Sequence, residues 1–161
     1  MMSYNKVQDI LKLVQTFHHN MQQALEQIQQ DSYSIVVEWL SDQIRRYEQH
    51  WQSALADYEK YGAQDVLDTW LQFVPDETVR KEINSITIHP DMTLEELVEI
   101  NMRFRNALID LYQTLATASA APRVQELFQQ LLEQEQAVIA HQSFMTRESD
   151  LVDSETCHKK E

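Results

Sequence analysis

The sequence predicts an all-α fold, a single domain in which four long helices form an antiparallel bundle. Three observations lead to this prediction. The chain has 161 residues, the size of one domain, and 43% of them are hydrophobic. It contains one glycine and three prolines, too few for the tight turns of hairpins and barrels. Apolar residues recur at steps of three and four positions through four long stretches, as the buried face of a helix requires.

Composition also excludes several classes of function and partner. Phosphate-binding loops and nucleophile elbows need more than one glycine, so we expect neither. Cys157 is the single cysteine, which excludes an intramolecular disulfide and favours the reducing cytoplasm. A net charge of −13 disfavours nucleic acid and membrane surfaces. The first residues do not resemble a signal peptide and no stretch is apolar enough for a membrane span, so we expect neither export nor insertion.

The first two helices are predicted at about residues 4 to 30 and 33 to 60. The turn signal Asp31-Ser32 separates them, and Gly62 marks the end of the second. The apolar face of the second helix is predicted to contain Val36, Leu40, Ile44, Tyr47, Trp51, Leu55 and Tyr58.

Residues 63–92 break the period and are predicted to be a long crossover with short helices of its own. Thr93 and Glu96 then match the capping-box pattern that begins a helix, and Pro122 begins the fourth helix, where a missing amide proton is tolerated. Residues 1–146 therefore make the bundle, and 147–161 are expected to be a disordered polar tail. Two helices, a long crossover and two more helices is the ferritin-like connectivity among bundles.

Several polar residues lie on the predicted buried faces, where an unpaired polar group costs about 1–3 kcal/mol. All are near the middle of their helices, so an antiparallel bundle can bring them into one layer. They are His18 on the first helix, Tyr47 and His50 on the second, Asn101 and Arg105 on the third, and Glu135 on the fourth. The halves are also weakly similar, since a shift of 87 or 88 positions aligns Phe17 with Phe104 and Glu38 with Glu126.

Over most of residues 5–146 the chain resembles the rubrerythrins and related ferritin-like di-iron proteins. The resemblance rests on residues 36–50 and 124–138, and on 107–116, which look like the third helix of that family. In that family each of two helical hairpins supplies a Glu from its first helix and Glu-x-x-His from its second.

When the ligand positions of that family are carried over to this sequence, the di-iron site is incomplete. Glu-x-x-His falls on Tyr47 and His50 in one half and on Glu135 and Val138 in the other, and the first-helix carboxylates fall on His18 and Arg105. Two irons need bridging carboxylates, so we do not expect a complete di-iron centre.

Two interpretations of this remnant stay open. In the first, Arg105 donates to Glu135 in place of a metal, Tyr47 and Asn101 complete a polar core layer with His50, and the protein is not an enzyme and has no cofactor. In the second, His18, His50 and Glu135 bind a single iron, zinc or manganese ion in a metal-binding protein or oxidoreductase.

We also expect a homo-oligomer, most simply a dimer. The crossover carries Trp70, Leu71, Phe73 and Val74 within a short segment, and this apolar surface serves either as an interface or as a cap on the bundle. A role in iron storage would require a shell-like assembly instead. The sequence does not identify the physiological role.

Overall fold

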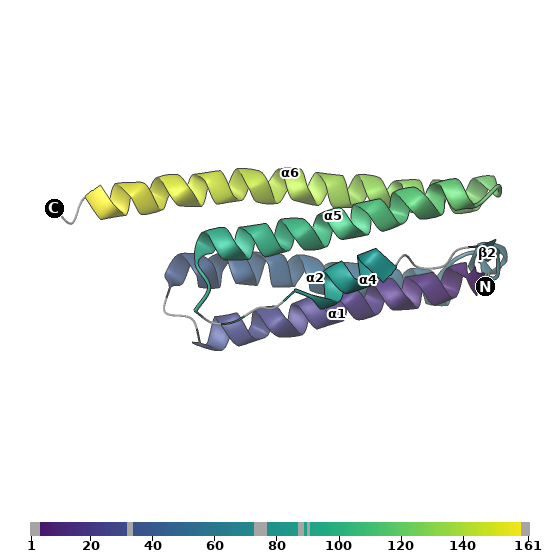
Figure 1. The fold of residues 1–161 in the computed structure, drawn as a ribbon, viewed down its shortest axis with the longest axis horizontal. Coiled ribbons are helices and arrows are strands. Elements are labelled where there is room, and N and C mark those ends of the chain that lie inside the picture. Colours follow the sequence, from purple (N-terminus) through teal and green to yellow (C-terminus); the bar gives the residue numbers. More distant parts are fainter. Residues whose placement is uncertain (1–3, 32–33, 73–76, 87–88, 90, 159–161) are drawn as a thin grey trace.

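The computed structural model describes residues 4–31, 34–72, 77–86, 89 and 91–158. Four long helices dominate it, and α1 packs against α2 while α5 packs against α6 (Figure 1). Both pairs are antiparallel hairpins, and the chain crosses from one to the other between α2 and α5. The four-helix architecture with a long crossover is as predicted. The helices are α1 (Val7–Asp31), α2 (Ile35–Tyr61), α5 (Leu94–Ala118) and α6 (Pro122–His158).

The predicted ends of these helices follow from local hydrogen bonding. The Thr93 hydroxyl accepts from the backbone N–H of Glu96 at 3.2 Å and caps α5, and Pro122 is the first residue of α6. At the end of α2 the backbone N–H of Gly62 donates to the Tyr58 carbonyl at 2.7 Å. A Cβ at position 62 would clash with that carbonyl oxygen, so the one glycine lies where the chain approaches itself closely.

The crossover forms two short helices, α3 (Gln64–Leu67) and α4 (Glu77–Asn84), as expected, but also a strand that was not predicted. Strand β2 (Trp70–Gln72) pairs antiparallel with β1 (Tyr4–Lys6), and the backbone N–H of Val7 donates to the Thr69 carbonyl at 3.0 Å. Three residues are too few to produce a recognisable alternating pattern. The ribbon forms because α3 turns the chain back beside the N-terminal segment.

The end of α6 also differs from the prediction. Residues 147–158 continue the helix, where a disordered tail was expected. No glycine or proline follows Pro122, so nothing in the chemistry of the backbone stops the helix. Figure 1 shows this part of α6 running past the ends of the other three helices.

The core is a continuous apolar cluster along the bundle axis, drawn from all four long helices. Its largest fully buried members include Phe104, Tyr112 and Phe128, and the last two rings stack with centroids 6.5 Å apart. In the crossover, Leu71 is buried whereas Trp70 is 60% exposed. Among the described residues, no helix combines the length and the apolar character that crossing a membrane takes.

Candidate functional site

Among the residues whose burial is described, each long helix contributes one buried acidic, basic or imidazole side chain to the middle of the bundle. These side chains are His18 from α1, Glu48 from α2, Arg105 from α5 and Glu135 from α6, and none is more than 1% exposed. We call the four the buried ring. Because burying an isolated charge is very costly, each member must find a partner among the others.

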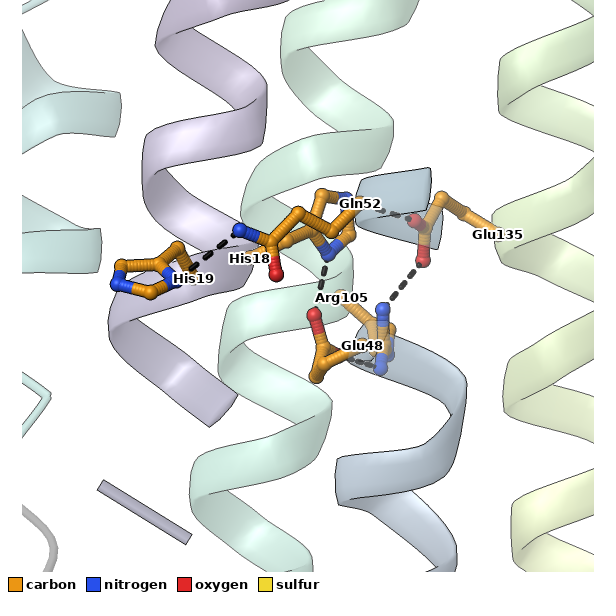
Figure 2. Close-up of polar contacts among 6 residues, drawn as sticks. All are labelled: His18, His19, Glu48, Gln52, Arg105 and Glu135. Carbon is orange, nitrogen blue, oxygen red and sulfur yellow. Dashed lines mark hydrogen bonds and ion pairs between the residues drawn. The ribbon is translucent and has the colours of Figure 1, made fainter. Parts of the chain in front are cut away.

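The contacts among these residues close into a circuit. Arg105 Nη1 donates to Glu135 Oε2 at 3.1 Å, and Arg105 Nη2 donates to Glu48 Oε1. His18 Nδ1 is hydrogen-bonded to the other oxygen of Glu48, and its Nε2 lies 3.8 Å from Glu135 Oε1. Figure 2 shows the guanidinium and the imidazole on opposite sides of the two carboxylates. Every carboxylate oxygen of the ring therefore faces a nitrogen.

Phe104 packs against the two basic members of the buried ring. Its ring lies edge-on to the His18 imidazole, with centroids 5.7 Å apart, and the Arg105 guanidinium carbon is 5.4 Å from its centroid. Phe104 is itself 1% exposed. This side chain thus gives the two basic members of the buried ring an aromatic neighbour in the core.

The pKa values of the ring members reflect this pairing. Burial alone would raise the pKa of the Glu48 carboxyl, but the charges of Arg105 and His18 and their hydrogen bonds hold it below its ordinary value of 4.5. Burial alone would lower the pKa of Arg105, and the two carboxylates raise it instead. Burial and the nearby Glu135 charge raise the pKa of Tyr112 well above its ordinary value, so this phenol is neutral.

The remaining predicted residues lie elsewhere. Asn101 is buried and its amide nitrogen donates to Gln142 Oε1 in a separate polar pair. Tyr47 is half-buried and its ring packs against His141, with centroids 6.0 Å apart. His50 is exposed and lies beside Trp51. The expected positions of Tyr47 and His50 in the core layer are therefore wrong, and the ligand set of His18, His50 and Glu135 does not form.

The reason is a one-residue error in the predicted face of α2. After Ile44 the next buried position is Glu48, four residues on, rather than Tyr47, three residues on. Both steps are compatible with a helix of 3.6 residues per turn, and the apolar pattern alone favours the aromatic Tyr47 over the charged Glu48.

Internal symmetry was the signal that could have identified Glu48. His18 and Glu48 are 30 positions apart, as are Arg105 and Glu135. A shift of 87 positions, already indicated by Phe17 and Phe104, superimposes the first pair on the second. In this register both copies of Glu-x-x-His keep the Glu, and the His positions hold Trp51 and Val138.

These residues do not fit a di-iron centre. Such a centre takes four carboxylates and two histidines from the bundle core, whereas the equivalent positions here supply two carboxylates and one histidine. Both carboxylates are already hydrogen-bonded to Arg105. Across the described part of the chain, no three His, Cys, Asp or Glu side chains are grouped so as to hold a metal ion.

The ring predicts a large loss of stability when its cation is removed. Arg105→Met leaves two buried carboxylates without their main partner, and we expect it to lower the free energy of unfolding by about 3–5 kcal/mol. Urea unfolding followed by circular dichroism measures this loss.

Arg103→Met is the matched control, because Arg103 is exposed and its bond to Glu82 lies on the surface. The urea midpoint of this variant should hardly differ from that of the wild type. The triple variant Arg105→Met, Glu48→Gln, Glu135→Gln should recover much of the loss. A loss below about 1 kcal/mol for Arg105→Met would contradict the assigned pairing.

The lowered pKa of Glu48 predicts the pH dependence of stability. A carboxyl whose pKa in the folded protein lies below its unfolded value stabilises the fold above the unfolded value, here about 4.5. That contribution is lost as the pH falls through the lower, folded pKa. The free energy of unfolding of the wild type should therefore decline below this pH more steeply than that of Glu48→Gln. Urea unfolding at a series of pH values measures this dependence. If the free energy of unfolding falls with pH equally steeply in both proteins, the assigned role of Glu48 is wrong.

No protein-family model matches the chain, and no curated protein matches it. Of the solved structures, a crystal structure of a protein from Thermotoga maritima, described provisionally as a ferritin-like diiron-carboxylate protein, is similar at a TM-score of 0.62 and 17% sequence identity. The likeness covers 92% of this chain and 99% of that one. At this identity it shows the fold alone, and it confirms the predicted all-α, ferritin-like bundle.

Proposed function

We propose that this protein is a non-catalytic ferritin-like bundle in which the buried ring takes the place of a di-iron centre. The observation that carries the proposal is that the Arg105 guanidinium donates to both buried carboxylates, Glu48 and Glu135. A fixed cation from the protein thereby supplies the positive charge that bound metal would otherwise provide. The bundle then acts through its surface, as a scaffold or binding module.

The distribution of the lost ligands supports this proposal. On the first helix of each hairpin the family carboxylate has become His18 or Arg105, and on the second helix the family histidine has become Trp51 or Val138. Losing a carboxylate and a histidine from each half while adding a buried arginine lowers the negative charge that two metal cations require. We propose that, among ferritin-like proteins, the chain is related to the rubrerythrins, on the residue patterns described above. We also propose that it is cytoplasmic, on its single cysteine.

A second candidate function is binding of one iron, zinc or manganese ion, with or without oxidoreductase activity. It is favoured by the presence of His18, Glu48 and Glu135 in one buried ring and by the description of the similar Thermotoga maritima protein as a diiron-carboxylate protein, although these three side chains are not grouped as metal ligands in the arrangement described above. In this candidate site Glu48 takes the place of His50, which the sequence pattern had predicted as a ligand together with His18 and Glu135. For such a site to form, Arg105 would have to leave both carboxylates.

Elemental analysis distinguishes the two candidates. Protein produced in iron-supplemented medium and then dialysed should contain less than about a tenth of an equivalent of any transition metal. Arg105→Met should take up more metal than the wild type, because it frees both carboxylates without altering His18. The matched control is again Arg103→Met, which leaves the core untouched. One equivalent of metal retained by the wild type would support the second candidate and overturn the first.

The exposed aromatic residues at the crossover support a proposal of dimerisation. Trp70 in β2 is 60% exposed and Tyr61, the last residue of α2, is 74% exposed, whereas Leu71 is buried and Phe73 and Val74 lie outside the described residues. A second copy of the chain covering this surface would bury both aromatic rings.

Size-exclusion chromatography with light scattering tests the interface. The wild type should elute at twice the chain mass of 19.0 kDa, and Trp70→Ser should be monomeric. Trp39→Ser, which removes a less exposed tryptophan from the first half of α2, serves as the control and should stay dimeric. A monomeric wild type, a dimeric Trp70→Ser, or a large shell-like assembly would each refute the proposed interface.

A further inference from the structure

A cavity of about 150 Å³, partly open to solvent, lies between α1, α4 and α5. Helix α4 packs against α5, and residues of α1 line the cavity together with both, so the crossover passes over the junction of the two hairpins (Figure 1). The cavity is distinct from the buried ring, because none of its lining residues belongs to that ring. It is therefore a hollow at the junction between the two halves of the bundle.

Polar and apolar atoms contribute about equally to the surface of this cavity, and its most deeply buried lining side chains are apolar. Phe17 from α1, Ile83 from α4 and Phe104 from α5 are each less than 10% exposed and form its interior, and Ala24 adds a small side chain on α1. The exposed side chains of Asn20 and Asn84 also line it, so they mark the side that faces solvent. A ligand here would meet apolar surface within and two carboxamides at the mouth.

We propose that this cavity binds a small uncharged ring compound that carries one hydrogen-bonding substituent, of the size and chemistry of a phenol. A volume of roughly 150 Å³ accommodates a benzene-sized ring, and the buried side chains of Phe17, Ile83 and Phe104 supply apolar contacts for it. Carboxamides both donate and accept hydrogen bonds, so Asn20 and Asn84 hold the substituent while the ring contacts Phe17 and Phe104.

The negative charge of the protein disfavours anionic ligands in this cavity. The chain carries a net charge of −13 and the lining residues include no cationic side chain, so an aromatic carboxylate is disfavoured. Phe104 contacts both the cavity and the basic side chains of the buried ring. A bound ring therefore rests against the residue that also packs on His18 and Arg105.

Calorimetric titration of the full-length protein with phenol, toluene and benzoate tests this site. Phenol and toluene should bind saturably at one site, and benzoate should not bind. Ala24→Phe fills the cavity and should weaken phenol binding at least about tenfold. Ala140→Phe, the same change at an exposed position on α6, should bind as the wild type does. Ala24→Leu provides a smaller filling substitution, and a thermal melt verifies that each variant is folded.

A second pair of changes tests the mouth of the cavity. Asn20→Ala with Asn84→Ala should weaken the binding of phenol but leave that of toluene unchanged. Absence of saturable phenol binding by the wild type, or equal binding by the folded Ala24 variants, would overturn the site. Equal effects of the asparagine changes on phenol and toluene would overturn the assignment of the substituent. Neither outcome depends on metal content, so the proposed function is tested separately.

Discussion

The guanidinium of Arg105 is the interaction on which the interior of this bundle depends. It bonds to Glu135 within its own hairpin and to Glu48 in the other, so one side chain joins the two halves through their most deeply buried charges. Separating the hairpins, or sliding one along the other, breaks the bond between Arg105 and Glu48 and leaves that buried carboxylate with His18 alone. We infer that the ring fixes the relative register of the hairpins, a role that a buried ionic group fulfils better than it adds net stability.

The ring also reflects the internal symmetry of the chain. The two hairpins place their buried ring members at the same spacing, and both have a glutamate on the second helix. They differ on the first helix, where one has His18 and the other Arg105. That difference matters chemically, because a symmetric set of carboxylates attracts metal cations, whereas an arginine among two carboxylates is already paired. An arginine, rather than a second histidine, at this symmetric position thus lets the buried side chains neutralise one another's charges.

Local chemistry determined the long helices and most of their ends. The scarcity of glycine and proline left few structures other than helices. Thr93 and Gly62 define boundaries through hydrogen bonds to residues within one turn, and Pro122 begins α6, where the amide proton that it lacks is not needed. The ribbon of β1 and β2 could not be predicted in the same way, since it pairs segments separated by the whole first hairpin. The end of α6 was misread because a polar, aperiodic sequence does not exclude a helix when nothing breaks it.

For the site, the sequence by itself determined which ionisable residue types were available on each helix and that Arg105 and Glu135 belonged to the interior. It could not decide between Tyr47 and Glu48, because successive buried positions on a helix are separated by either three or four residues. The tertiary structure made that choice, since only Glu48 lies within reach of both His18 and Arg105. The energy of a buried carboxylate depends on partners from other helices, and that information is absent from the periodicity of any single helix.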